Sequence, residues 1–359
     1  MMRGVEPEPP LFSAFPHLRG RVPWMPLGRF PTRVERVAGL APDGVELWIK
    51  RDDESGVEYG GNKVRKLEFL LAEARARGAR RLCTLGGIGS HHVLATAIYG
   101  ARAGFEVEAV VFPQPVTEHV REQLRADLAA GALLTPTRGY LGVPLAVWRG
   151  KRKPETMWIA PGGSSVTGTL GYVSAGLELR AQIECGNLPQ PDVIYVALGS
   201  CGTAAGLAVA LAGLTPAVEV VAVRVVDRLV ANAGKTRRLA RDTHALVAPG
   251  VKWRGGSLGL RVEHGFFGGR YGRATDASEA AVREAARAGL RLETTYTGKA
   301  MAALLADARA GRLDGKRVLF WHTYNGVDLA PLIARAGERA EAGGRLPPLV
   351  ARHLAPGAL

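Results

Sequence analysis

Short hydrophobic runs alternate with amphipathic segments along most of the chain. The run VELWIKRDD (45–53) predicts a strand, and the next segment predicts a helix, because apolar residues from Val64 to Ala74 recur at helical spacing before Gly78. The same reasoning predicts strands at 80–87, 106–112, 156–163, 219–226 and 317–323, helices at 90–104, 117–131, 171–184, 276–289 and 298–311, and a strand–turn–helix unit at 192–213. This alternation is typical of βαβ units, so we expect an α/β protein with parallel sheets.

The two ends of the chain lack this pattern. Residues 1–31 are rich in proline and are expected to be irregular, and 337–359 are expected to form a loose tail. A length of 359 residues suggests two domains at about 150 residues each.

Composition excludes several classes of protein. The formal charge is +14, but the arginines are dispersed among acids and alanines on predicted helices, which argues against nucleic-acid binding. The 3 cysteines (Cys83, Cys185, Cys201) have no paired or metal-like spacing, which indicates a reducing compartment. The N-terminus has no secretory h-region, and no apolar run could span a bilayer, so we expect a cytoplasmic protein without membrane contact. No histidine spacing predicts a metal site.

Glycine turns follow three predicted strands, at Gly86-Gly87, Gly162-Gly163 and 199–202. Open α/β sheets bind ligands at the carboxyl ends of their strands. In GSCGTAAG (199–206), small residues expose backbone N–H groups at a helix start, where Ser200 and Thr203 add hydroxyl donors for a phosphate. Alternatively, these residues form a tight strand–helix turn that binds no ligand.

Lys63 is unusual at its position, because a cation is electrostatically disfavoured in the first turn of a helix. A lysine that forms a Schiff base must be neutral, and both burial and the helix N-terminus favour that form. A phosphate cradle without a nucleotide motif, together with such a lysine, points to pyridoxal 5′-phosphate.

The segment KRDDESGVEYGGNKVRKLEFLLAEARARGA resembles the signature of the 1-aminocyclopropane-1-carboxylate deaminase and D-cysteine desulfhydrase family. The resemblance extends over about 25–330 and includes GGIGSHH, PGGSSVTGTLGY, GSCGT, YTGKAM and FWHT. It implies a fold-type II pyridoxal-phosphate enzyme, related to the tryptophan synthase β subunit, with two open twisted parallel-sheet domains and the cofactor in the cleft between them. It also implies a large domain of 1–66 and 175–359, a small inserted domain of 67–174, and a homodimer.

The resemblance assigns roles to particular residues. Lys63 would be the Schiff-base lysine and proton shuttle, preceded by Asn62. Ser90 would contact the substrate carboxylate or assist proton transfer, and His91 would contact the cofactor's 3′ oxygen. The phosphate would be held by Ser200, Cys201, Gly202 and Thr203. Tyr271 and Tyr296 would flank cofactor and substrate, and Thr323 would be a neutral partner of the pyridine nitrogen.

The sequence also departs from the family pattern. His91 stands where the family has asparagine, Cys201 replaces a glycine, and Tyr324-Asn325 interrupt an H-T-G-G motif. Thr297 follows the second tyrosine where ring-opening deaminases have glutamate, which favours the desulfhydrase side of the family. Lys299 is expected to be structural, although a Schiff-base role stays open, and Arg65 and Lys66 are expected to be surface or helix-packing residues.

The interpretation is a pyridoxal-phosphate lyase acting on a small amino acid, closest to D-cysteine desulfhydrase, giving pyruvate, ammonia and sulfide. Two alternatives stay open. One is other chemistry on the same scaffold, such as β-replacement, deamination of a different amino acid or racemisation. The other is a non-catalytic protein with this fold.

Overall fold

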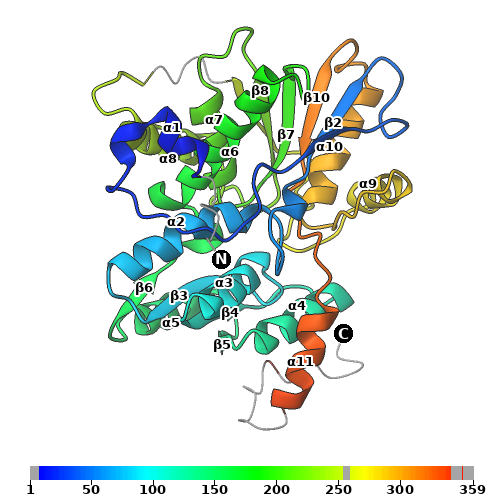
Figure 1. The fold of residues 1–359 in the computed structure, drawn as a ribbon. Coiled ribbons are helices and arrows are strands. Elements are labelled where there is room, and N and C mark those ends of the chain that lie inside the picture. Colours follow the sequence, from blue (N-terminus) through cyan, green and yellow to red (C-terminus); the bar gives the residue numbers. More distant parts are fainter. Residues whose placement is uncertain (1–7, 254–258, 341–349, 351–359) are drawn as a thin grey trace, which may run out of the picture. The chain divides into compact units, whose positions relative to one another are not determined.

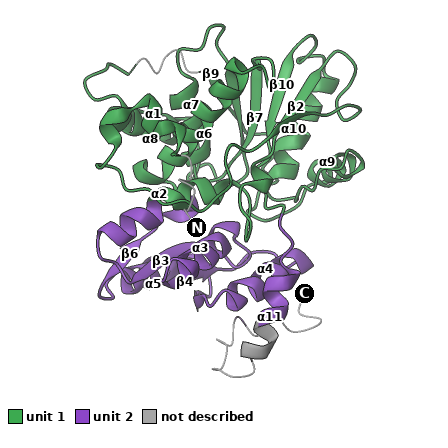
Figure 2. Cartoon of the chain, in the orientation of Figure 1, with its two compact units in different colours: residues 1–69, 164–326 green, residues 70–163, 327–359 purple. Residues whose placement is uncertain are grey.

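Two compact units make up the chain in a computed structural model that describes residues 8–253, 259–340 and 350. The first unit comprises residues up to Phe69 and Ser164–Gly326, and the second comprises Leu70–Gly163 with the described residues from Val327 onward (Figure 2). The predicted insertion was 67–174, whereas the second unit runs from Leu70 to Gly163 and also includes the described chain after Gly326. None of the described helices is long and apolar enough to cross a membrane.

The first unit contains a six-stranded sheet in the order β1-β2-β10-β7-β8-β9. These strands are β1 (Val34–Arg36), β2 (Glu46–Lys50), β10 (Arg317–Trp321), β7 (Val193–Leu198), β8 (Glu219–Arg224) and β9 (Gly259–Glu263). Only β1 runs antiparallel, to β2, and the other neighbours pair in parallel.

Helices cover both faces of this sheet (Figure 1). The helices of the first unit are α1 (Pro10–Ala14), α6 (Val166–Glu184), α7 (Gly202–Leu211), α8 (Ala233–Val247), α9 (Asp276–Arg287), α10 (Thr297–Arg309) and the start of α2 (Asn62–Ala76). Successive strand residues point to opposite faces. Tyr195 therefore packs with α9 and α10 in one core, while Ile194 and Val196 pack with α6 and α7 in another.

The second unit is built on a four-stranded parallel sheet in the order β5-β4-β3-β6. Its strands are β5 (Leu133–Pro136), β4 (Glu106–Phe112), β3 (Arg81–Gly87) and β6 (Thr156–Trp158). Its helices are the rest of α2, α3 (His91–Arg102), α4 (Glu118–Ala129), α5 (Val143–Lys151) and α11 (Ala330–Ala340), the last of which packs on α4.

The predicted elements are present, with additions at less regular places. The segment expected to be irregular contains α1, whose Leu11 and Phe12 are buried. The predicted strand 156–163 ends at Trp158, because a 3-10 turn begins at Pro161. The predicted loose tail overlaps the end of α11, and its residues 341–349 and 351–359 lie outside the described part of the chain.

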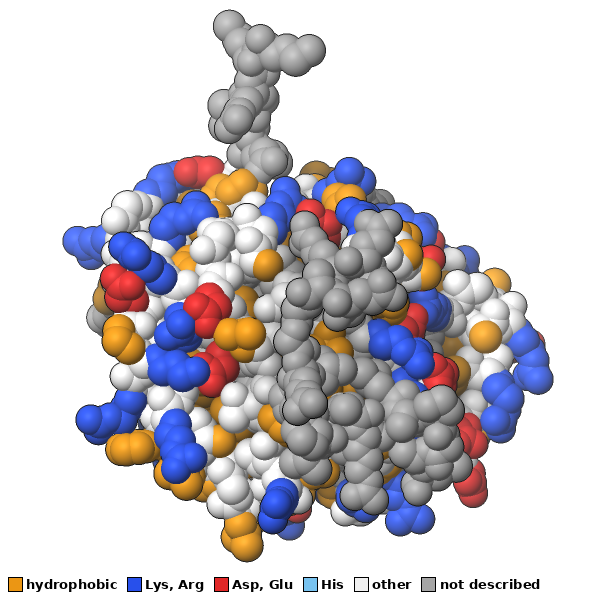
Figure 3. Space-filling model, turned by 90° about the horizontal axis from the view of Figure 1, so that it is seen from below, with side chains coloured by type: hydrophobic (Ala, Val, Ile, Leu, Met, Phe, Trp, Pro, Cys, Tyr) orange, Lys and Arg blue, Asp and Glu red, His pale blue; other side chains and the backbone are white. Residues whose placement is uncertain are grey.

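Charged side chains are dispersed on the face drawn in Figure 3, where lysines and arginines alternate with acids and apolar residues. In the second unit, some cations have acidic partners, as in the pairs Arg81–Glu106 and Lys153–Glu108. The three cysteines are unpaired.

Candidate functional site

A glycine turn places Lys63 at the start of α2. Gly61 has a φ of +86°, and a Cβ there would lie 2.7 Å from the carbonyl oxygen of Thr323. The same carbonyl accepts a hydrogen bond from the backbone N–H of Asn62 (3.2 Å), and the Asn325 side chain accepts one from that of Gly60 (2.6 Å). The segment after β10 therefore fixes the turn, and Thr323 and Asn325 support the lysine through it.

The Lys63 amine is linked to the glycine loop after β7. Its Nζ donates to Asn62 Oδ1 (2.6 Å), and Asn62 Nδ2 donates to Thr203 Oγ1 (3.1 Å). Burial lowers the pKa of Lys63 from 10.5 to about 8, while the charge of Glu293 opposes this shift. The neutral amine required for imine chemistry is thus accessible near neutral pH.

The loop between β7 and α7 forms a polar cradle. Ser164 Oγ lies 2.8 Å from Ser200 Oγ and accepts a hydrogen bond from the backbone N–H of Gly202 (3.1 Å). A Cβ at Gly202 would lie 2.6 Å from Ser164 Oγ and 3.0 Å from Lys66 Nζ, so a larger residue there would displace these polar groups of the cradle. Hydroxyls, a backbone N–H and a helix start gather here, and this donor set suits the phosphate of pyridoxal 5′-phosphate.

Lys66 joins this cradle, which the sequence reasoning missed. Its side chain is buried, and Nζ donates to Ser164 Oγ (3.2 Å). Burial, followed by the charge of Lys63, lowers the pKa of Lys66 well below 10.5. A bound dianion would favour the protonated amine, which fits a phosphate ligand. Arg65 and Lys66 were expected to be surface or helix-packing residues, and their burial excludes the surface alternative. The spacing of Lys66 one turn after Lys63 on the same helix face was the available signal for its place in the cradle.

Cys201 occupies a position that glycine adopts more easily. Its φ is +72°, in the left-handed region, where a side chain costs on the order of 1 kcal/mol. Its side chain belongs to the apolar core formed with Tyr172 and Leu207. The Cys201 side chain thus packs in this core, and the side chains that form the cradle are those of its neighbours. The predicted role of Cys201 toward the phosphate stays a prediction.

Two tyrosines meet beside the cradle. The hydroxyls of Tyr271 and Tyr296 are 2.8 Å apart, and a Cβ at Gly199 would lie 3.0 Å from the ring of Tyr296. Burial, followed by the proximity of Tyr271, raises the pKa of Tyr296 well above 10. Tyr296 therefore stays protonated, and the hydroxyl pair can donate a hydrogen bond to a ligand beside the loop.

Two buried charged residues hold this tyrosine pair in place. The Glu293 carboxylate accepts hydrogen bonds from the backbone N–H groups of Tyr296 and Thr297 (both 2.8 Å). Lys299 Nζ donates to the carbonyl oxygen of Phe267 (2.6 Å), in the loop that leads to Tyr271. Burial lowers the pKa of Lys299 to about 8. These contacts support a structural role for Lys299. Glu293 was not identified as a site residue from the sequence.

Ser90 and His91 lie in the second unit, at the start of α3. Ser90 caps this helix, with its Oγ accepting from the backbone N–H of Val93 (3.5 Å). His91 Nε2 lies 3.3 Å from Nε2 of His119. The predicted roles of Ser90 and His91 toward substrate and cofactor stay predictions. Among the described residues, no group of three or more His, Cys, Asp or Glu side chains could hold a metal ion.

The inserted Tyr324 is buried in the first unit. The guanidinium of Arg291 lies 5.9 Å from the centre of its ring. Tyr324 thus packs beside Thr323 in the segment that supports the Lys63 turn, which accommodates the departure from the family motif. The proposed contact between Thr323 and the pyridine nitrogen stays a prediction.

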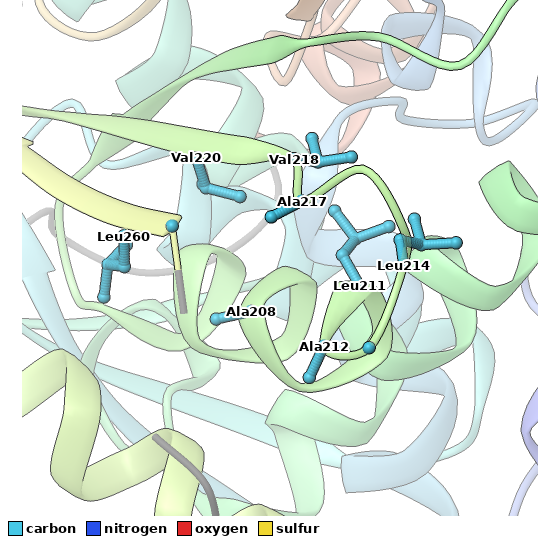
Figure 4. A pocket seen from close by; sticks show the side chains of 10 residues that line it. Ala208, Leu211, Ala212, Leu214, Ala217, Val218, Val220 and Leu260 are labelled. Carbon is cyan, nitrogen blue, oxygen red and sulfur yellow. The ribbon is translucent and has the colours of Figure 1, made fainter. Parts of the chain in front are cut away.

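A separate apolar pocket lies between the end of α7 and the starts of β8 and β9 (Figure 4). Leu211, Leu214, Val218 and Leu260 line it, and none of its described lining residues is titratable. It is at the amino ends of the strands, whereas α/β sheets bind ligands at the carboxyl ends. We therefore do not assign the chemistry to this pocket.

The geometry of Lys66 leads to a testable expectation. Replacing Lys66 with methionine should weaken pyridoxal 5′-phosphate binding by about 10- to 100-fold, because a charge-assisted hydrogen bond contributes roughly 1.5–3 kcal/mol. Titration of the cofactor, followed by visible absorption, measures this change. Lys153→Met removes a lysine that is paired with Glu108 in the second unit, so it should bind the cofactor normally. Equal affinity of Lys66→Met and wild type would contradict the role of Lys66.

Comparison with known proteins agrees with this site. Residues 25–323 match the family model described as "Pyridoxal-phosphate dependent enzyme". The chain is 37% identical to nocardicin C-9′ epimerase of Nocardia uniformis subsp. tsuyamanensis, covering 85% of this chain and 93% of that protein. It is 35% identical to D-cysteine desulfhydrase of Yersinia pestis (strain Pestoides F), covering 81% and 90%.

Solved structures give the same result. A crystal structure of a 1-aminocyclopropane-1-carboxylate deaminase homologue is 28% identical, with a TM-score of 0.75, covering 92% of this chain and all of that chain. O-ureido-L-serine synthase shares the fold, with a TM-score of 0.61 at 16% identity. The predicted fold class, family resemblance and cofactor are confirmed. The chain therefore belongs to the pyridoxal-phosphate dependent enzyme family, whose cofactor is pyridoxal 5′-phosphate.

Proposed function

We propose that the protein is a lyase that eliminates a β substituent from a small amino acid, with D-cysteine as the first candidate substrate. The observation that carries this proposal is the Lys63 amine, with a pKa of about 8, linked through Asn62 to the cradle at Thr203. The similarity of this chain to D-cysteine desulfhydrase of Yersinia pestis supports the choice of substrate.

The residues of this chain would divide the work as follows. When bound, the cofactor supplies an electron sink for negative charge at Cα. Lys63 Nζ takes the Cα proton, and the hydroxyl pair of Tyr271 and Tyr296 donates to the leaving sulfur. Ser90 and the first N–H groups of α3 bind the substrate carboxylate.

The surroundings of Thr297 favour elimination over ring opening. Thr297 Oγ1 donates to Glu293 Oε1 (3.1 Å), so this side chain is engaged within its own helix start. Position 297 thus offers no carboxylate to keep the pyridine nitrogen protonated. Loss of a good leaving group requires less stored carbanion charge than ring opening does.

Epimerisation of an amino acid is the second candidate. Two observations favour it: the relative of 37% identity is an epimerase, and an imidazole pair stands at His91 and His119 beside Ser90. A second acid–base group is what inversion at Cα requires if Lys63 acts from one side only.

The test is to load the protein with cofactor and add D-cysteine, L-cysteine or D-serine in D₂O. Pyruvate, ammonia and sulfide from D-cysteine would support the lyase proposal. Deuterium at Cα with the opposite enantiomer and without pyruvate would support epimerisation instead. A cofactor absorption band that no amino acid changes would contradict both.

A further inference from the structure

A buried arginine without an acidic partner lies at the carboxyl end of β8, in the first unit. Arg224 is the last residue of β8, and it is only 9% exposed. Among the described residues, no carboxylate forms a hydrogen bond or an ion pair with it, and its acceptors are all neutral. Buried charges in proteins are normally paired, so an anion from outside the chain would complete this position.

The guanidinium of Arg224 is held in place but is not saturated. Nε donates to Nδ1 of His264 (2.8 Å), Nη2 donates to the carbonyl oxygen of His264 (3.4 Å), and Nη1 donates to that of Val226. The ring centre of Phe267 lies 4.8 Å from the guanidinium carbon and covers one of its faces. A guanidinium has five N–H groups, so these three bonds leave two N–H groups that can bind a ligand.

The contact with Arg224 also fixes the state of His264. Because arginine can only donate, Nδ1 of His264 must accept, and the neutral ring carries its proton on Nε2. Partial burial, followed by the charges of Arg224 and Arg228, lowers the pKa of His264, while Glu263 opposes this shift. The carboxylate of Glu263 is itself engaged by the backbone N–H of Gly265 (2.7 Å). His264 is therefore a neutral second donor beside the guanidinium.

These two donors lie at the ligand-binding edge of the six-stranded sheet. Arg224 ends β8 and His264 follows β9, and because these strands are parallel neighbours their carboxyl ends share one edge. Residues 225–226 belong to the core against which Tyr271 and Tyr296 pack. Arg224 and His264 are thus on the side of the sheet that carries the tyrosine pair, and all of these residues belong to the first unit.

The phosphate of the cofactor has a different set of donors. Its cradle follows β7 and includes Lys66 as a cation. The sheet order is β7-β8-β9, and the side chain of Arg224 bonds to the residue after β9, so it extends away from the loop after β7. The anion that Arg224 requires is therefore a group of the substrate rather than the cofactor phosphate.

We propose that Arg224 and His264 bind a carboxylate on the side chain of the substrate, so that the protein acts on amino acids with an acidic β substituent. This inference rests on the proposed function, because it names the substrate class of the same site. The simplest such substrate is a cysteine with a carboxymethyl group on sulfur.

Elimination from this thioether balances without any oxidant or reductant. The Cα proton leaves, and its electron pair forms the Cα–Cβ double bond. The Cβ–S bond breaks with its electron pair on sulfur, which takes a proton. One water is consumed as pyruvate, ammonia and mercaptoacetate are released.

Equilibrium binding to the holoenzyme tests the subsite without turnover. 2-Aminoadipate has the shape of S-carboxymethylcysteine but no leaving group, and its side-chain amide is the neutral control. Isothermal titration calorimetry with each enantiomer should show that one form of the acid binds about 10- to 100-fold more tightly than the amide, because a charge-assisted hydrogen bond to the carboxylate is lost in the amide.

The Arg224→Met variant should bind acid and amide equally, with the affinity for the amide unchanged. Arg228→Met removes an exposed arginine of the loop after β8, so it should keep the wild-type preference. Arg224→Lys keeps the charge without the planar fork and should keep part of the preference. It also replaces Arg224→Met in the test if the methionine variant does not fold.

Equal affinities for acid and amide in the wild type would overturn the subsite. A lowered Tm of Arg224→Met with an unchanged preference would also overturn it, because Arg224 would then only brace the loops. Turnover tests the proposed function separately. Pyruvate from D-cysteine without any preference for the acid would remove this inference and keep the lyase. Selective binding of the acid through Arg224, without elimination from D-cysteine or from S-carboxymethylcysteine, would keep the carboxylate subsite and overturn the lyase.

Discussion

Replacing Lys63 with alanine should abolish the lysine-linked absorption band of the bound cofactor and lower turnover by about 10³-fold or more. Lys63 is expected to hold the cofactor covalently and to move the Cα proton, and proton transfer by a positioned group contributes about 10²–10⁴-fold. The amine is suited to both roles, since its pKa is lowered to about 8. Borohydride reduction followed by peptide mapping should place the fixed cofactor on residue 63 in the wild type.

Two buried lysines near Lys63 or the tyrosine pair could compete for the cofactor, so the assignment can fail. Lys299 also has a pKa lowered to about 8, and Lys66 lies in the phosphate cradle. Lys299→Met should keep the covalent label on residue 63, because its amine is engaged with the carbonyl oxygen of Phe267. A label on residue 66 or 299 in the wild type, or full turnover by Lys63→Ala, would refute the role of Lys63.

Replacing Arg65 with methionine should destabilise the first unit by about 3–5 kcal/mol, which is the usual cost of leaving buried charges without their partner. Arg65 is buried and binds the carboxylates of Asp52 (2.7 Å) and Glu178 (2.9 Å). Lys50 is the second cation of this network. Removing Arg65 leaves two buried carboxylates facing one amine. Thermal unfolding should show a loss of roughly 10 °C in Tm.

A surface pair provides the matched control for Arg65. Arg33 is half exposed and paired with Glu54, so Arg33→Met should cost less than about 1 kcal/mol. Similar Tm values for Arg65→Met and Arg33→Met would contradict the importance of the buried network.

Acid should reduce the effect of Arg65→Met. Although burial opposes it, the charge of Arg65 and its hydrogen bond hold the pKa of Asp52 at about 2, below the ordinary 3.8. A carboxyl with a depressed pKa in the folded state contributes stability above its unfolded pKa and loses it as the pH falls toward the folded value. The difference in stability between wild type and Arg65→Met should therefore be full near neutral pH and shrink between about pH 4 and pH 2.

Local sequence patterns were sufficient to predict the strands and helices around the site. The predicted strand 106–112 is β4 with the same limits. Its central residues are all buried, as is typical of a strand inside a parallel sheet. The short elements β1, β5 and β9 were missed, since three to five residues give little periodicity. Helix α8 was also missed, although its buried residues Thr236, Ala240, Thr243 and Val247 recur at helical spacing.

Some residues of the site were likewise predicted from the sequence, and others were not. A motif of contiguous residues marks Lys63, Asn62 and the loop 199–203, and the structure joins them through the contact of Asn62 with Thr203. Lys66, Ser164 and Glu293 were not identified as members, because their roles depend on contacts between segments far apart in the chain. The spacing of Lys66 from Lys63 puts both residues on one helix face, but only the contact with Ser164 shows that Lys66 belongs to the cradle.

The sequence by itself determined the fold class, the family and the cofactor, because short contiguous motifs and the alternation of apolar segments carry that information. Tertiary structure alone decided the surroundings of each charged group. Only there do Arg65, Asp52 and Glu178 become a buried network, Lys66 join the cradle, and His91 meet His119. The physical reason is that pKa, hydrogen-bond partner and tautomer depend on burial and on neighbours brought together by folding, and these neighbours are remote in sequence.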